Sequence, residues 1–278
     1  MKLLRWVGPS LLAVCALVPA ASAQINIVPV ISGNQLTAQI QLVGGISADL
    51  TITFEQVVGL NANALVLSAS VVDPTDPALL SRLPAGGLVT IPSGFPVVLH
   101  IEPTSSSSLS FSGIYKLSLH TANLTFAPAF RLFRGPAGGA LADMTGSLDM
   151  GSVRAGGSGP GYSDFLIVVD ARVVDAVITA KFDALQSTLT ANSGSMPTSV
   201  FNDLQTKLNN ARTLYNGGSY AASITAVTTF SDTVKNQSGT AIPDVWQANS
   251  SLVNVAGMLR SAADTLKYSL TVRANQPG

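Results

Sequence analysis

The hydrophobic pattern of this chain changes its period near residue 172, and this change constrains the fold more than any other feature. Before it, apolar and polar residues alternate, so that Leu50, Ile52 and Phe54 would lie on one face of a strand. After it, apolar residues such as Ile178 and Phe182 recur every three or four positions, the spacing of an amphipathic helix. The sequence therefore predicts strands in the first part and helices in the second.

Short strand-like segments separated by glycine and proline turns fill the part before residue 172. No strand–helix–strand alternation occurs there, which argues against a parallel sheet. Many short strands at this spacing favour an antiparallel β-sandwich over residues 24–172. The segments are Ile25–Ile31, Gln35–Leu42, Leu50–Val57, Ala64–Val71, Val97–Glu102, Ile114–His120, Phe130–Phe133 and Asp164–Val169.

Four helices with short connections are predicted over residues 173–270. Asn192 and the next two residues end the first, and the second begins near Pro197 and ends at Gly217-Gly218. Gly239 ends the third, and the fourth opens at Ile242–Asp244. Short connections favour an antiparallel four-helix bundle. The predicted fold class is thus α+β, a sandwich followed by a bundle, with 271–278 as a C-terminal tail. Almost no linker separates the two parts, so we expect one rigid unit.

The first 23 residues have the three parts of a secretory signal peptide. Lys2 and Arg5 precede an apolar stretch over Leu11–Val18, and small residues then lead to a cleavage site between Ala23 and Gln24. The stretch is shorter than the roughly 20 residues of a membrane-spanning helix, and no later run reaches that length. We therefore expect a secreted or periplasmic protein without a transmembrane segment.

Cysteine usage and charge narrow the possible partners. Cys15 is the single cysteine and lies in the predicted signal peptide, so the exported chain would contain no disulfide. A loose similarity to a lipoprotein processing site around Cys15 keeps lipid anchoring open as an alternative. Charged residues make up only 11% of the chain and the net charge is +0, which excludes the basic surface that nucleic-acid binding requires.

His100, Glu102 and His120 are the residues from which a metal site could be built. His100 and Glu102 are two apart on one predicted strand and share a face, while His120 lies on another strand. Histidine and carboxylate are zinc ligands, but no spacing typical of a zinc site accompanies them. We therefore expect polar residues on solvated strand faces, and we assign no catalytic, metal-binding or cofactor-binding residues and no cofactor.

Two other segments resemble ligand-binding loops. Asp73–Asp76 could offer oxygen ligands to calcium, but it lacks regular carboxylate spacing, and a capped turn before a short helix over Pro77–Leu83 fits better. Gly156–Gly161 is glycine-rich without the lysine and helix of a phosphate-binding loop, so we expect a hairpin or disordered tip.

Arg131 and Arg134 flank an aromatic residue in a predicted strand and could meet acidic ligands. We expect them to pair instead with strand carboxylates such as Asp143 or Asp164. Trp246 falls within the predicted fourth helix, where an aromatic side chain is expected to be part of the core.

Residues in both parts of the chain occur in an order that resembles known proteins. They are Phe201, Leu204, Leu208, Ala211, Tyr215, Gly217, Ile224, Phe230, Val234, Gly239 and Pro243, with Phe111–Gly113, Leu119–Leu124 and Phe165–Val168 in the sandwich. The helical part resembles the small FIMAH-type helical module found at the ends of some secreted bacterial hydrolases. The whole chain also resembles an uncharacterised family of bacterial secreted proteins, in which a sandwich precedes such helices. These resemblances imply export and a sandwich-plus-helices layout, and no assigned activity.

The function that these observations favour is that of an exported, non-enzymatic binding or interaction protein. Its partner is unknown, with an envelope protein and a glycan as the candidates. Two alternatives remain open: an accessory module that contacts polysaccharide, and a metal-dependent hydrolase.

Overall fold

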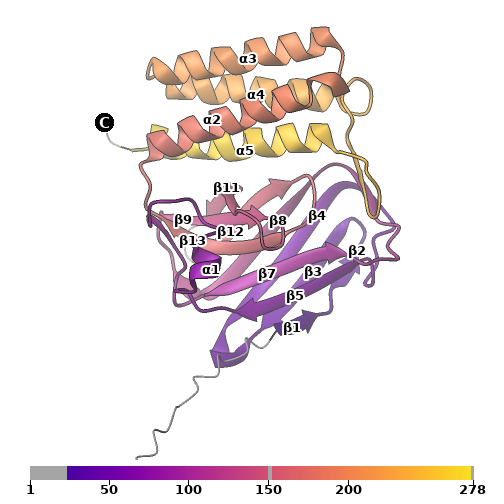
Figure 1. Cartoon of the computed structure of the whole chain (residues 1–278), viewed down its shortest axis with the longest axis vertical. Helices are drawn as coiled ribbons and strands as arrows, with labels where there is room; N and C mark the ends of the chain where they lie inside the picture. The colour runs from indigo at the N-terminus through magenta and orange to yellow at the C-terminus, as the bar shows by residue number, and fades with distance from the viewer. Residues whose placement is uncertain (1–23, 150–151, 277–278) are drawn as a thin grey trace, which may run out of the picture.

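The computed structural model describes residues 24–149 and 152–276, which form two antiparallel sheets covered at one end by helices (Figure 1). The predicted α+β class and the absence of parallel pairing between the named strands are confirmed within this part of the chain. The predicted signal peptide, with Cys15 and Ala23, lies outside the described residues. Gln24, the expected first residue after cleavage, begins the first strand.

The first sheet contains seven strands, one of which pairs only with the end of a neighbour. In spatial order they are β1 (Gln24–Ile27), β5 (Leu65–Val71), β7 (Val97–Pro103), β13 (Asp164–Asp170), β9 (Phe130–Gly135) and β10 (Ala142–Asp143), with β6 (Val89–Thr90) paired to β13.

The second sheet also contains seven strands. In spatial order they are β11 (Thr145–Asp149), β12 (Ser152–Gly159), β8 (Ser110–Thr125), β4 (Ser47–Val58), β3 (Gln35–Gln41) and β2 (Val30–Ser32), with β14 (Val245–Gln247) paired to β8. A short 3-10 turn, η1 (Val43–Gly45), connects β3 to β4.

The two sheets face each other across one hydrophobic core. Alternate residues of each strand point inward, such as Leu36 and Ile52 of the second sheet and Leu67 and Leu99 of the first, and all four are buried. The core thus explains the period of two that the sequence displays. We call these two sheets together the sheet pair.

A smaller apolar cluster covers the outer face of the first sheet. The short helix α1 (Pro77–Leu80) brings Leu79 against Phe133 and Leu166. The side chain of Asp76 accepts a hydrogen bond from the backbone N–H of Ala78 at 2.9 Å, so it caps this helix as the sequence predicts.

Four longer helices form the second part of the molecule, which we call the helical layer. They are α2 (Val174–Ala191), α3 (Thr198–Asn216), α4 (Tyr220–Gln237) and α5 (Val255–Ala274). Each packs against two of the others around a core that includes Phe182, Leu204, Phe230 and Leu266. Helices α2 and α5 lie next to the sheet pair, and α3 and α4 lie farther away (Figure 1). Because α5 continues to Ala274, the first four residues of the expected tail are helical.

The helix ends follow the local signals in the sequence. A short 3-10 turn, η2 (Ser193–Ser195), separates α2 from α3. After α3, Gly218 has φ +75°, its N–H donates to the Tyr215 carbonyl, and the Ser219 N–H donates to the Leu214 carbonyl. This pair of bonds is a Schellman motif, in which glycine takes the left-handed position. Gly239, with φ +72°, follows α4 in a different turn, in which its N–H donates to the Ile242 carbonyl at 2.9 Å.

No helix in residues 24–149 and 152–276 combines the length and apolar character that crossing a bilayer requires.

The predicted start of the last helix is wrong. The sequence places it at Ile242–Asp244, but α5 begins at Val255. The intervening segment leaves the helical layer and adds β14 to β8. There the Trp246 ring stacks on the Phe111 ring with centroids 5.2 Å apart. Sheet pairing and this aromatic contact override the helical spacing of the segment.

Two strand predictions are also corrected. Gly156–Gly159 is part of β12 and pairs with both β8 and β11, so it is not a disordered tip. A side chain at Gly157 would collide with the Met144 backbone, and one at Gly159 with the Tyr115 ring, which explains the glycines. Ile25–Ile31, expected as one strand, is divided between β1 and β2, which belong to different sheets.

Candidate functional site

A groove of about 580 Å³ lies where the helical layer meets the end of the sheet pair. Helices α2 and α5 form one side, and the segments around β9, β10 and β12 form the other. Its lining is mainly apolar, and it has the size and character of small-molecule sites in proteins. The apolar lining includes Ala180, Ala184, Met258, Ala262, Leu141 and Met144.

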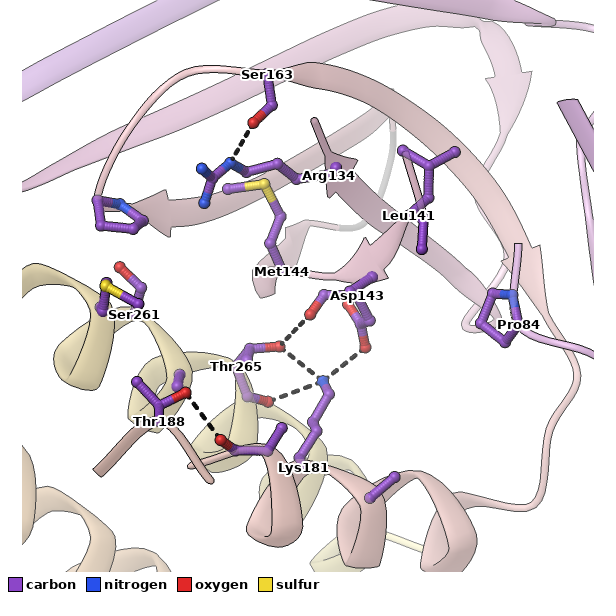
Figure 2. A pocket seen from close by; sticks show the side chains of 18 of the residues that line it. Pro84, Arg134, Leu141, Asp143, Met144, Ser163, Lys181, Thr188, Ser261 and Thr265 are labelled. Atoms are coloured by element: carbon purple, nitrogen blue, oxygen red, sulfur yellow. Dashed lines mark hydrogen bonds and ion pairs between the residues drawn. The ribbon is translucent and has the colours of Figure 1, made fainter. Parts of the chain in front are cut away.

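A buried ion pair between Lys181 and Asp143 forms part of the groove lining. Lys181 reaches from α2 to β10, and its Nζ lies 2.6 Å from the Asp143 Oδ2 (Figure 2). The same ammonium donates to the Thr265 Oγ1 at 2.7 Å, the Ser269 Oγ at 2.8 Å and the Thr265 carbonyl at 3.1 Å. Burial lowers the pKa of Lys181, and the Asp143 charge opposes this shift. These contacts fully occupy the ammonium, which acts here as a link between α2, α5 and the sheet pair.

The two arginines in the groove lining differ in their partners. Arg172 forms two hydrogen bonds with the Asp170 carboxylate, at 2.9 and 2.7 Å. Burial alone would raise the pKa of Asp170, but these contacts with Arg172 hold it below the ordinary range. Arg134, in contrast, donates only its Nε–H, to the Ser163 Oγ at 3.0 Å (Figure 2). Among residues 24–149 and 152–276, no carboxylate pairs with Arg134.

An aromatic cluster adjoins Arg134 at this end of the sheet pair. The Tyr115 and Tyr162 rings stack with centroids 5.5 Å apart, and the Trp246 ring meets Tyr162 edge-on at 5.1 Å. The Tyr115 hydroxyl donates to the Gly161 carbonyl at 2.6 Å. Burial raises the pKa of Tyr115 and of Tyr162, so both phenols stay neutral in the ordinary pH range.

Two buried hydroxyls near the groove lack a hydrogen-bond partner within the described part of the chain. They are the Ser261 Oγ, on the α5 side of the groove lining, and the Tyr162 hydroxyl in the aromatic cluster. A buried hydroxyl without a partner is unfavourable, so each is a point where a bound molecule or water could add a hydrogen bond.

A second ion pair fixes α5 against the second sheet. Arg260 binds both Glu55 carboxylate oxygens, each at 2.6 Å. The Glu55 Oε2 also accepts from the Ile114 N–H at 3.2 Å. Gly113, with φ +76°, lets the chain pass so close to Glu55 that any side chain there would collide with its carboxylate. Burial would raise the pKa of Glu55, but the contacts with Arg260 and the Ile114 N–H hold it below 4.5. The α5 wall of the groove is thus held in a defined position.

The structure does not bring His100, Glu102 and His120 together. His100 lies on β7 of the first sheet, where its Nε2 is 3.4 Å from Glu102 and its Nδ1 is 2.6 Å from Asp164. His120 lies on β8 of the second sheet, 3.3 Å from Asp49. Both histidines alternate with core residues, so they occupy opposite outer faces of the sheet pair. Within the described residues, no group of three His, Cys, Asp or Glu side chains has the geometry of a metal site.

The predicted partners of Arg131 and Arg134 are wrong. Asp143 pairs with Lys181, and Asp164 pairs with Arg82 at 2.7 Å. Arg131 donates to backbone carbonyls and lies over the ring of Tyr268, 5.3 Å from its centroid.

The predictions from the sequence include no role for Lys181 or Arg260, although both side chains are buried and form ion pairs in the structure. Lys181 stands three residues after Ile178 and four before Leu185, within the apolar stripe of α2. Arg260 stands beside Leu259 and three residues before Ala263, in the stripe of α5. A charged residue at a buried helical position is a visible signal, because it requires a buried partner.

Comparison with known proteins places the chain in a family without assigning it an activity. No curated protein and no solved structure matches the chain. A family model matches residues 11–274, nearly the whole sequence. The chain therefore belongs to the family of unknown function DUF6689.

Proposed function

We propose that this protein is an exported, non-enzymatic binding protein whose ligand site is the groove between the helical layer and the sheet pair. The observation that carries the proposal is the groove itself, an apolar-lined space of about 580 Å³ with one arginine that has no carboxylate partner in the described chain. Apolar clefts with a few directed polar groups are typical of small-molecule sites, and junctions between structural parts often hold them.

We also propose that residues 24–172 and 173–270 work as one rigid unit, with the helices as an antiparallel four-helix bundle. Three polar contacts support this: Lys181 with Asp143, Arg260 with Glu55, and the Ser158 Oγ with the Asp264 Oδ2 at 2.8 Å. If the two parts act as one unit, limited proteolysis will not release separately stable halves around residue 172, and release of such halves would contradict this part of the proposal.

A groove-filling variant tests the binding site. Ala184 lines the groove and is exposed, so Ala184→Phe fills space without crowding the core. Ala176 is exposed on the same helix outside the groove, which makes Ala176→Phe a matched control. We expect at least one of 1-octanol, octanoate and octylamine to bind the wild type and the control in calorimetry, and to bind Ala184→Phe at least tenfold more weakly. Equal binding by all three proteins, or binding by none, would refute this site.

Export has its own test. In a bacterial host, we expect the protein outside the cytoplasm, with Gln24 as its first residue by mass spectrometry. A protein that keeps residues 1–23 in the cytoplasm would contradict export, and one that begins at Cys15 with an attached lipid would establish the lipid-anchored alternative.

A second candidate, contact with polysaccharide, is favoured by the outer face of the second sheet. Polar side chains stand in register across it: Gln35 is opposite Thr53, which is opposite Lys116, and Thr37 is opposite Thr51. Hydroxyl and amide groups are suitable hydrogen-bond partners for sugars. Co-sedimentation with cell-wall polysaccharide, retained by Ala184→Phe and lost on replacing Thr51 and Thr53 with glutamate, would establish this alternative. A metal-dependent hydrolase has no such support, because its candidate ligands His100, Glu102 and His120 lie on opposite faces of the sheet pair.

A further inference from the structure

We infer that the groove binds a small carboxylate with a hydrocarbon body, and that the Arg134 guanidinium receives its carboxylate group. This inference rests on the proposed binding function and adds the chemical class of the ligand.

The charged groups that line the groove are Arg134, Asp143, Arg172 and Lys181. The Lys181 ammonium is compensated by the Asp143 carboxylate, and the Arg172 guanidinium by the Asp170 carboxylate. The Arg134 charge is left without a counterpart among the described residues. The groove therefore has an excess of one positive charge, which a ligand with one negative charge would neutralise.

The one hydrogen bond that Arg134 makes fixes its orientation and leaves its other donors available. Its Nε–H is bound by the Ser163 Oγ, and no hydrogen bond within the described chain engages its Nη1 or Nη2. The N–H groups of a guanidinium form a planar fork that matches the two oxygens of a carboxylate, so one ligand group can take two parallel hydrogen bonds. A phosphate also fits this fork, but a phosphate monoester carries about −1.5 to −2 charge at pH 7, so the single excess positive charge favours a carboxylate.

The walls of the groove suit a hydrocarbon body. Ala180, Ala184 and Ala262 present small apolar side chains from α2 and α5, and Met144 and Leu141 face them from the sheet pair. A volume of about 580 Å³ has room for on the order of twenty atoms of the size of water, which exceeds the need of an eight-carbon acid. Burying its methylene groups adds roughly 0.8 kcal/mol for each one that leaves water.

Trp246 provides a spectroscopic signal close to Arg134. A side chain built at Gly161 would begin 3.3 Å from the Trp246 Nε1 and 3.9 Å from the Arg134 Nη2, so both nitrogens lie beside Gly161. Trp6 is the only other tryptophan in the chain. In the full chain carrying Trp6→Phe, tryptophan fluorescence therefore reports on the surroundings of Arg134.

The experiment compares octanoate, 1-octanol and inorganic phosphate as ligands of that chain, by Trp246 fluorescence and by calorimetry. We expect saturable binding of octanoate, with 1-octanol about 10- to 100-fold weaker, the factor that a charge-assisted bidentate contact supports. Arg134→Met should abolish this preference, and Arg134→Lys should keep only part of it. Arg154→Met is the control, because Arg154 is exposed on β12 and also has no carboxylate partner within the described chain.

Several outcomes would overturn the inference. Equal affinity for octanoate and 1-octanol, both lost in Ala184→Phe, would leave the groove as a binding site and remove the role of Arg134. Phosphate binding as tight as octanoate would refute the carboxylate class. Failure of every probe to bind would refute the proposed function as well. If circular dichroism shows that Arg134→Met does not fold, the chain that retains Arg134 still tests the inference. Octanoate must then bind that chain more tightly than 1-octanol does.

Discussion

Replacing Asp143 with asparagine would leave the Lys181 ammonium buried without its counterion. The two side chains expose only 9% and 3% of their surface. One Asp143 oxygen accepts from the Thr145 N–H at 2.8 Å and the other from Lys181, so an asparagine must turn its NH₂ group toward one of these donors. Breaking a buried pair in this way costs about 3–5 kcal/mol, and we expect Asp143→Asn to lose that much unfolding free energy.

A double-mutant cycle with Lys181→Met separates the ion pair from other effects. Once the ammonium is gone, the asparagine no longer faces a buried charge, so Asp143→Asn should cost far less in the Lys181→Met background. We expect a coupling free energy of at least about 2 kcal/mol, because the two residues are in direct contact.

The pH dependence of Asp143→Asn gives an independent check. Burial lowers the pKa of Lys181, and in the wild type the Asp143 charge opposes this shift. Without that charge, burial keeps the pKa of Lys181 below 10.5. Between that lowered pKa and 10.5, the unfolded state binds more protons than the folded state, so stability rises with pH. Asp143→Asn should therefore recover part of its loss between about pH 7 and about pH 9.5, relative to wild type.

Urea unfolding followed by circular dichroism measures all three quantities. A loss below about 1 kcal/mol in Asp143→Asn, or single-variant losses that simply add in the double variant, would refute the reasoning. Either result would mean that water reaches the Lys181–Asp143 ion pair and that this ion pair does not hold the helical layer against the sheet pair.

Three further variants test local features of the fold by thermal or urea unfolding. Gly218→Val should cost about 1–2 kcal/mol, because a β-branched residue is strained at φ +75°, whereas Gly217→Ala, at φ −83°, should cost less; equal losses would contradict the Schellman motif. Gly157→Ala should cost about 1–3 kcal/mol through collision with the Met144 backbone, with Gly146→Ala as a control that keeps ordinary contact distances; a neutral Gly157→Ala would refute the close approach. Since the pKa of Glu55 is lowered, its stabilising contribution is complete above 4.5 and is lost as the pH falls through the lowered value. Glu55→Gln should therefore lose less stability than wild type between about pH 6 and about pH 3, and identical pH profiles would contradict the role of Glu55.

Features that depend on neighbouring residues could be predicted from the sequence. The alternation of Leu50, Ile52 and Phe54 places a strand correctly, because one buried face imposes a period of two. Gly218 marks the end of α3, because the left-handed position favours glycine whatever lies around it. Asp76 identifies a helix start for the same local reason.

Features that depend on distant residues could not be predicted in this way. The glycines of β12 suggest a loop until Met144 and Tyr115 are known to occupy the space beside them. The segment around Trp246 has helical spacing, yet it pairs with β8 and stacks on Phe111. The groove itself combines residues from segments as far apart as Arg134 and Ala262, so no local pattern reveals it.

The position of α5 has a consequence for how the chain acquires its structure during synthesis. This helix lies between α2, α4 and the second sheet, and its Arg260 pairs with Glu55, 205 residues earlier. Until α5 has been synthesised, the apolar surface that it covers on α2 and α4 is exposed and Glu55 lacks its counterion. Such long-range contacts slow folding, and the folding intermediate exposes apolar surface that promotes aggregation. We therefore expect a chain that ends shortly before Val255 to aggregate rather than to form a smaller stable protein.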